Sequence, residues 1–182
     1  MGDPRRPRRR YSRPTHPWRI ERLTEENDLV KKYGLKNKRE IWRAKTALSG
    51  YRGQARALLG SSGESVEKNK KELLDKLNIL GIMDSRSLDD VLALKVEHIL
   101  DRRLQTIVVK KGLARTTKQA RQLVVHGHVI VGENAIAVPK YLVPRSQEDQ
   151  IRVSEKIIEK IKVINVGEGR DDKAKEAPKE AG

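Results

Sequence analysis

The sequence has no cysteine among its 182 residues, which excludes disulfide bonds and zinc sites with cysteine ligands. Phenylalanine is also absent, and aromatic residues make up only 3% of the chain. A sheet that reads single-stranded nucleic acid by base stacking is therefore not expected. No apolar run of about 18 or more residues could span a bilayer, and no apolar segment of a signal peptide follows the charged start. We expect a cytoplasmic protein.

Acidic residues are too few to balance the basic ones. The formal net charge is +15 and the sequence pI is about 10.1, which indicates a polyanionic partner. The charge is concentrated in residues 1–17, with six arginines and one acid, and in residues 102–145, with nine basic residues and one acid. Nucleic acid is favoured over an anionic membrane surface, because the chain lacks membrane-inserting segments. The 36% of hydrophobic residues can build a core of ordinary extent in one or two domains.

A basic amphipathic helix is expected near residues 116–126. Thr116 or Thr117 can cap its N-terminus. One arc of this helix is apolar and should face a core: Ala120, Leu123 and Val124. The opposite arc is polar and is expected to meet phosphate groups: Lys118, Arg121 and Gln122.

Short strands should follow this helix, because Gly127 suits a helix end and residues 129–138 alternate around a turn at 132–134. A longer helix should precede it over residues 96–111, where apolar residues recur at helical spacing. Residues 151–166 are rich in β-branched side chains and should add one or two strands, although a helix over 155–162 remains open. The expected class is α+β, with a helical N-terminal region followed by a small module of helices packed on an antiparallel β-sheet or hairpin.

The N-terminal half has the pattern of several helices. Thr24 can cap one that ends at Gly34. Asn37, with Glu40 three residues later, resembles a capping box at the start of a longer helix. Four cations follow one stripe of that helix without a neutralising acid, which favours RNA contact over a solvated face: Lys38, Lys45, Arg52 and Arg56. Two further helices are expected within residues 61–95.

Four segments are therefore expected along the chain. Residues 1–17 combine six arginines with four prolines and should form a disordered basic arm that orders along phosphates, the alternative being a solvated tail. Residues 18–95 should form a helical RNA-binding region, and residues 96–166 a small RNA-binding module with β-strands. Residues 167–182 should be a disordered charged tail.

Two sets of motifs resemble a known family. In the second half they are RL at 103–104, GLAR at 112–115, AR at 120–121, LVVHGHV at 123–129 and VP at 138–139. They are similar to the small RNA-binding module first described in small-subunit ribosomal protein four, a module that also occurs in pseudouridine synthases and tyrosyl-tRNA synthetases. In the first half, YGLKNKREIWR at 33–43 and LALKVEHIL at 92–100 resemble the archaeal and eukaryotic form of that ribosomal protein family itself.

The resemblance implies a structural constituent of the small ribosomal subunit. It implies binding to a multi-helix junction in the 5′ domain of the small-subunit ribosomal RNA, a role early in assembly and an influence on decoding accuracy. The implied partners are this RNA, neighbouring small-subunit ribosomal proteins and messenger RNA near the path by which it enters. Some relatives carry a cysteine-bound zinc near the N-terminus, from which this cysteine-free chain departs.

The sequence is also compatible with other functions. The alternative is a messenger-binding translational repressor or another non-ribosomal binder of structured RNA. An RNA-modifying enzyme built on the module would need a catalytic domain for which the remaining residues offer no pattern. A nonspecific DNA binder would bind duplex DNA and structured RNA equally well at matched salt.

No catalytic, cofactor or metal site is expected, because no nucleophile motif or phosphate-cradling glycine loop occurs. The pair His126 and His128 lacks further ligands, so contact with RNA is favoured over metal binding. The residues expected to bind RNA are Arg5, Arg6, Arg8, Arg9, Arg10, Arg13, Lys36, Lys38, Arg39, Arg43, Lys45, Arg52, Arg56, Arg102, Arg103, Lys110, Lys111, Arg115, Thr116, Lys118, Gln119, Arg121, Gln122, His126, His128 and Lys140.

Overall fold

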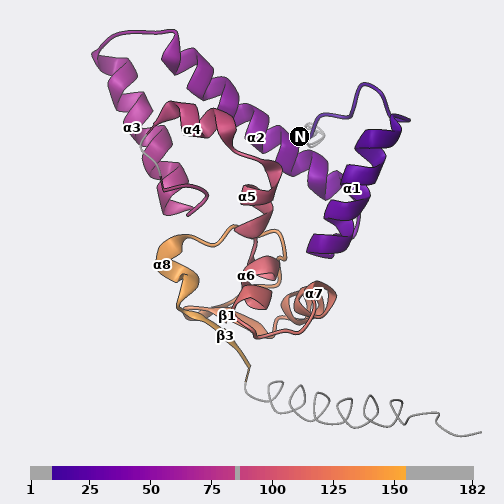
Figure 1. Ribbon diagram of the computed structural model, residues 1–182. Coiled ribbons are helices and arrows are strands. Elements are labelled where there is room, and N and C mark those ends of the chain that lie inside the picture. The colour runs from indigo at the N-terminus through magenta and orange to yellow at the C-terminus, as the bar shows by residue number, and fades with distance from the viewer. Residues whose placement is uncertain (1–9, 85–86, 155–182) are drawn as a thin grey trace, which may run out of the picture.

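The computed structural model describes residues 10–84 and 87–154, and it confirms the α+β class. Figure 1 shows a helical N-terminal region above a small module of helices and strands. The elements are α1 (Ile20–Tyr33), α2 (Lys38–Leu59), α3 (Glu64–Ile79), α4 (Leu88–Ala93), α5 (Val96–Asp101), α6 (Leu104–Lys110), α7 (Thr117–Val125), β1 (Val129–Val131), β2 (Asn134–Ala135), α8 (Arg145–Glu148) and β3 (Ile151–Val153).

Helix α2 is the centre of the N-terminal region and packs against α1, α3, α4 and α5. It begins after Asn37 as predicted, and its inward arc includes the fully buried Ile41 and Ala55. The helix is continuous through Gly50 and Gly53, and both glycines lie on an open face with no atom near the position of a Cβ. The core of this region is completed by side chains from α3, α4 and α5, among them Leu77, Val91 and Leu100.

The module consists of α6, α7 and a three-stranded antiparallel sheet in the order β2-β1-β3. Thr116 caps α7 by accepting a hydrogen bond from the Gln119 backbone N–H, as predicted, at 3.2 Å. The apolar arc of α7 is buried, also as predicted: Ala120, Leu123 and Val124. Strand β3 confirms the strand expected to begin at residue 151. Residues 155–166 of the same expected segment lie outside the described residues.

Three expected boundaries are wrong. Helix α1 begins at Ile20, and the Thr24 hydroxyl donates to the Glu21 carbonyl inside the helix instead of capping it. The helix expected over residues 96–111 is two helices, α5 and α6, because the returning chain pairs with the backbone at the break: the Val143 N–H donates to the Arg102 carbonyl. The second hairpin strand ends at residue 135, before the expected alternation ends.

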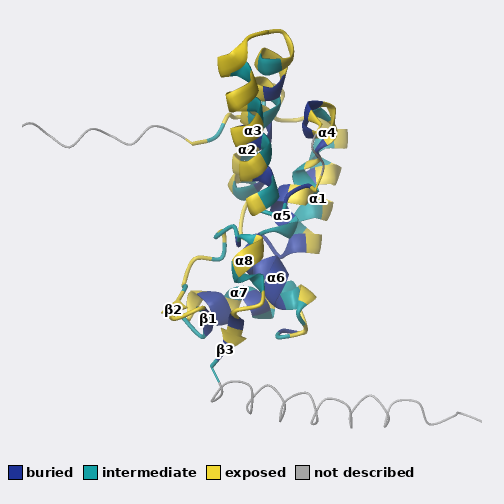
Figure 2. Cartoon of the chain, turned by 90° about the vertical axis from the view of Figure 1, so that its left-hand side faces the viewer, coloured by how far each residue is buried: buried dark blue, intermediate teal, exposed yellow. Residues whose placement is uncertain are grey.

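The described residues form two hydrophobic cores. One lies in the N-terminal region and includes Ile99 and Leu100 of α5, and the other begins at Leu104 of α6 and fills the module. Figure 2 shows buried residues in both the helical region and the module. Helix α5 thus packs with the N-terminal region, although the sequence placed the start of the module at residue 96. The two cores meet at the Arg102-Arg103 break.

Candidate nucleic-acid interface

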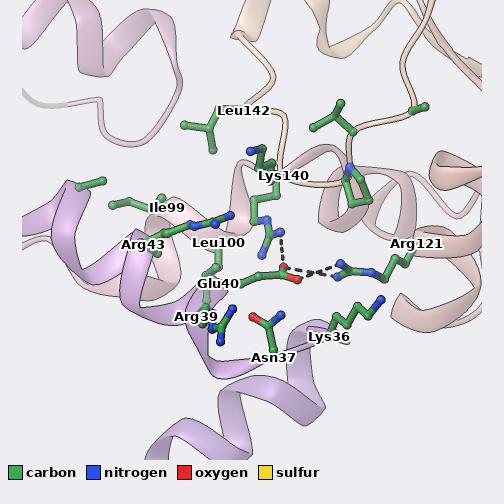
Figure 3. A pocket seen from close by; sticks show the side chains of 16 residues that line it. Lys36, Asn37, Arg39, Glu40, Arg43, Ile99, Leu100, Arg121, Lys140 and Leu142 are labelled. Carbon is green, nitrogen blue, oxygen red and sulfur yellow. Dashed lines mark hydrogen bonds and ion pairs between the residues drawn. The ribbon is translucent and has the colours of Figure 1, made fainter. Parts of the chain in front are cut away.

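A buried ion-pair cluster joins the two cores. Glu40, in the first turn of α2, accepts hydrogen bonds from Arg121 of α7 at 2.8 Å and from Arg103 at 2.5 Å (Figure 3). The side chain of Arg103 is 6% exposed, that of Glu40 is 13% exposed and that of Arg121 is 24% exposed. We call Glu40, Arg103 and Arg121 the joint cluster. Since its members come from both halves of the chain, it connects them.

The protonation of Glu40 follows from this environment. Burial by itself would raise the pKa of the Glu40 carboxyl, but the hydrogen bonds from Arg121 and Arg103, together with their positive charges, outweigh it. The pKa of Glu40 is therefore lowered, and the carboxylate is charged at neutral pH. The capping box expected from Asn37 and Glu40 is wrong in this respect, because the Asn37 side chain makes no capping hydrogen bond and Glu40 points to the arginines.

A second buried contact lies beside the joint cluster. The side-chain amide nitrogen of Gln105, a buried residue of α6, is 3.0 Å from the Tyr33 carbonyl oxygen and 2.8 Å from that of Thr117. It thereby connects the end of α1 to the start of α7. Gly34 lies in the same contact with φ 57°, and a Cβ there would be 2.6 Å from the Thr117 Oγ1. Only glycine fits this position without displacing α7.

Replacing Gly34 by Ala is therefore expected to destabilise the chain. Backbone strain alone should cost roughly 1–3 kcal/mol, and the approach to Thr117 adds to it. Gly50→Ala is the matched control, because Gly50 lies in α2 with open space around it and alanine favours the helix by about 0.5–1 kcal/mol. Denaturant unfolding measures both variants. Equal stability of the two would show that α7 does not press on the Gly34 turn.

Several cations that the sequence assigned to RNA are engaged within the protein. Arg103 and Arg121 belong to the joint cluster, so the expectation that Arg121 lies on an outward arc is wrong: this side of α7 faces α2. Others hold acids or carbonyls of the chain: Lys45 with Glu26, Arg52 with the Leu94 carbonyl, Arg102 with Glu148 and the Val143 carbonyl, Lys110 with Asp101, and Lys111 with Asp149. The stripe on α2 is consequently not free of acids, since Glu26 reaches it from α1.

Other predicted cations have no partner among the described residues. Lys36, Lys38, Arg39, Lys118 and Lys140 make no hydrogen bond or ion pair there, and all except the half-buried Lys38 are exposed. Lys36, Arg39 and Lys140 line a cleft of about 490 Å³ between α2 and the segment of residues 137–142 (Figure 3). We call it the α2 cleft. Arg43 lines it as well, with its guanidinium 6.0 Å from the centre of the Tyr11 ring.

The chain is similar to known proteins over most of its length. Residues 102–151 match the family description "S4 domain". Over 152 residues, 83% of the chain, it is 51% identical to "Small ribosomal subunit protein uS4" of Methanothermobacter thermautotrophicus, of which it covers 89%. It is also 51% identical to the proteins of that name from Hyperthermus butylicus and Ignicoccus hospitalis, of which it covers 86% and 92%. The chain belongs to the uS4 family.

Membership of the uS4 family makes the chain a structural, RNA-binding constituent of the small ribosomal subunit. The resemblance expected from the motifs at 33–43, 92–100 and 103–139 is confirmed. None of the relatives in these comparisons supports the alternative of a messenger-binding repressor. None of the helices in the described parts of the chain is long and apolar enough to cross a membrane.

Part of the expected basic arm of this uS4 chain lies against α2. Tyr11 packs on Trp42 with ring centres 5.9 Å apart, and the Ser12 N–H donates to the Thr46 hydroxyl at 3.0 Å. Arg13 is exposed and lines a second hollow together with Lys38 and Arg39. Arg10 is exposed as well, whereas the other arm arginines lie outside the described residues: Arg5, Arg6, Arg8 and Arg9.

The remaining predicted residues surround α7 or lie on α2. Gln119 turns back, and its side-chain oxygen accepts from the Arg115 N–H at 2.8 Å, so Thr116 and Gln119 both shape the start of α7. Gln122 is exposed, and so is Arg56, which reaches only the Arg52 carbonyl. The rings of His126 and His128 lie 6.0 Å apart at the end of α7. Among the described residues, no three His, Asp or Glu side chains gather as a metal site would require.

The sequence missed one member of the candidate interface and misassigned another. Asn37 lines the α2 cleft with a side chain that makes no capping hydrogen bond, whereas its position predicted a cap. Glu40 was also assigned to that cap. The arginine partners of Glu40 are 63 and 81 residues away, so local sequence patterns do not reveal them. The one available signal was that Glu40 is the single acid among the cations at positions 36–45.

Proposed function

We propose that the unpaired cations around the first turns of α2 are the surface by which this uS4 chain holds ribosomal RNA. The observation that carries the proposal is that the basic residues fall into two groups, those with partners in the protein and those without. Those at the joint have acids or carbonyls of the chain as partners, whereas Lys36, Arg39 and Lys140 have none among the described residues. Unpaired, exposed cations are available to neutralise phosphates and release counterions.

The rigid joint gives this surface its specificity for shape. Lys36 and Arg39 come from the N-terminal region, and Lys140 comes from the segment that follows the hairpin. The joint cluster holds these elements together, so that the cations keep fixed spacings. A fixed set of cations favours an RNA fold whose phosphates have the same spacing, which is recognition of backbone shape rather than of base sequence.

Further roles are proposed on the family resemblance. By bridging RNA segments the chain nucleates or stabilises assembly of the subunit, and it influences decoding accuracy from a position near the path by which messenger RNA enters. Its other partners are neighbouring small-subunit ribosomal proteins, and its location is the cytoplasmic ribosome. We propose no catalytic activity, since the site consists of unpaired cations and contains no nucleophilic side chain with a general base beside it.

The proposed surface is tested by replacing Lys36, Arg39 and Lys140 together with Ala. Loss of three phosphate contacts should weaken binding to small-subunit ribosomal RNA and reduce the slope of log K against log salt by roughly two to three units, at ~0.7–0.9 per contact. Stability should change by no more than about 0.5 kcal/mol per exposed site. Filter binding over a salt series and thermal melting provide the two measurements.

The matched control removes three cations from α3, Lys70, Lys71 and Lys76, which lie away from the α2 cleft. Its salt slope should remain close to that of the unmodified chain. If both triple variants bind alike, net charge rather than this surface holds the RNA. Equal affinity of the unmodified chain for duplex DNA at matched salt would indicate a nonspecific binder and contradict the proposal.

A further inference from the structure

The α2 cleft has an apolar floor beneath a basic rim. Its floor includes Leu100, 1% exposed, together with Leu142 and Pro139 from the segment that returns after the hairpin. Its rim carries Lys36, Arg39, Arg43 and Lys140 (Figure 3). Its volume of about 490 Å³ is within the roughly 300–1,000 Å³ of cavities that enclose small organic ligands. A surface that met only phosphate groups would not need an apolar hollow.

No acidic group in the cleft is available to a cationic or peptide amine ligand. Glu40 is the one acid among the residues that line it, and both of its carboxylate oxygens accept from arginines. The charge of the cleft therefore selects an anionic occupant. Its apolar floor requires that the same occupant also have a hydrophobic face.

Two polar groups at the cleft lack partners among the described residues. The Asn37 side chain makes no capping hydrogen bond and, in Figure 3, points between Lys36 and Arg39 toward the cleft. The Nε of Arg103 is buried in a side chain that is only 6% exposed, and it has no hydrogen-bond partner. An amide offers one acceptor and two donors, so the exposed Asn37 side chain can meet the edge of a flat polar ring. The Arg103 Nε–H is buried beneath the surface and does not reach such a ring.

We propose that the α2 cleft receives one unpaired nucleotide of the bound RNA. The base lies on the apolar floor and against the guanidinium plane of Arg39 or Arg43, and its edge meets the Asn37 amide. The flanking phosphates meet Lys36 and Lys140. RNA bases that leave the helical stack are commonly held in this manner, by stacking on side-chain planes and by hydrogen bonds to their edges. The proposal rests on RNA binding through this surface and adds to it a site for a single base.

The direct test uses three RNA hairpins of the same length: one fully paired, one with a single bulged nucleotide, and one with an abasic residue at the bulge. The chain is expected to bind the bulged hairpin about tenfold more tightly than the paired one, given the strength of stacking on one base. The abasic hairpin should lose this advantage, because its backbone is as flexible but it has no base to insert. A 2-aminopurine bulge should report the insertion by a change in fluorescence.

Three substitutions without a change of charge locate the effect. Ala47→Phe fills the cleft from the exposed face of α2, and Ala57→Phe places the same side chain on an exposed position of α2 outside the cleft. Ala47→Phe should abolish the preference for the bulged hairpin, and Ala57→Phe should keep it. Asn37→Ala should reduce the preference severalfold and make it independent of which base is bulged. All three should keep the salt slope of the unmodified chain.

The outcomes distinguish this proposal from the one on which it rests. Equal affinity for the paired, bulged and abasic hairpins, with the salt slope of a chain that holds several phosphates, would overturn the nucleotide site and leave RNA binding intact. A bulge preference that survives Ala47→Phe would place the base elsewhere and also overturn it. Loss of RNA binding through the surface itself would appear instead in the triple-cation variant, whose effect does not depend on a bulge.

Discussion

Replacing Glu40 by Gln is expected to lower the free energy of unfolding by about 3–5 kcal/mol, because it leaves a buried guanidinium without its counter-charge. Arg103 is 6% exposed and cannot turn to solvent in place. Arg121 loses the same partner, and the N-terminal region and the module lose their central contact. Denaturant unfolding at neutral pH, with the m-value as a check on cooperativity, measures the effect.

The matched control is Glu97→Gln, which breaks the ion pair with Lys32 at 3.1 Å. Both of those side chains are about half exposed, at 46% and 60%. Such a surface pair contributes at most about 1 kcal/mol. If Glu40→Gln cost no more than Glu97→Gln, the joint cluster would not hold the two cores together.

Acidification should reproduce part of the Glu40 effect. The pKa of Glu40 is lowered in the folded chain, so its contribution to stability is present above the pKa of the unfolded carboxyl and is lost as the pH falls through the folded value. The unmodified chain should therefore lose stability on acidification in that range more steeply than Glu40→Gln. Parallel pH profiles of the two proteins would contradict the assigned cause.

Deleting residues 1–9 is expected to have the largest effect on RNA affinity. The deletion removes Arg5, Arg6, Arg8 and Arg9, and it leaves Tyr11 in its contact with Trp42. If each arginine neutralises one phosphate, the slope of log K against log salt should fall by roughly three units, at ~0.7–0.9 per contact. Thermal stability should remain within about 0.5 kcal/mol of the unmodified chain. Binding is measured over a salt series.

Two further deletions serve as controls for this result. Removing residues 167–182, which carry four basic and five acidic residues, should leave the slope unchanged. Removing residues 1–17 should reduce the slope further and also lower stability, because it takes away the packing of Tyr11 on Trp42 and the Ser12 bond to Thr46. An unchanged slope after deletion of residues 1–9 would show that these arginines form a solvated tail.

Several elements whose signals lie within one turn of the chain were predicted well, although the Thr24 cap of α1 was not. The start of α2 after Asn37, the Thr116 cap of α7 and the buried Leu123 arc all follow from contacts between residues a few positions apart. Boundaries that depend on distant segments were not. The helix expected over 96–111 is broken at Arg103, where Leu142 of the returning chain forms a bridge with its backbone. Helical periodicity cannot report a partner 39 residues away.

The candidate site shows the same distinction at the level of side chains. From the sequence, Arg121 and Lys118 are equivalent cations on the polar arc of one helix. In the structure Arg121 is paired with Glu40, 81 residues away, while Lys118 is exposed without a partner in the described parts of the chain. A helical wheel separates the apolar face of α7, which packs on the core of the module, from its polar face. It does not show that the N-terminal region covers part of that polar face.

The sequence by itself determined that the chain binds a polyanion, that a small helix-and-strand module follows a helical region, and that the motifs are those of a ribosomal protein family. Net charge and apolar periodicity depend only on the identity and order of the residues, so they can be read without the fold. Only the tertiary structure decided which cations of residues 10–84 and 87–154 lack a partner there, that Glu40 joins the two cores, and that the α2 cleft lies beside that joint. The physical reason is that an ion pair and a cleft depend on the approach of elements distant in the chain, and that approach is set by the packing of the whole molecule.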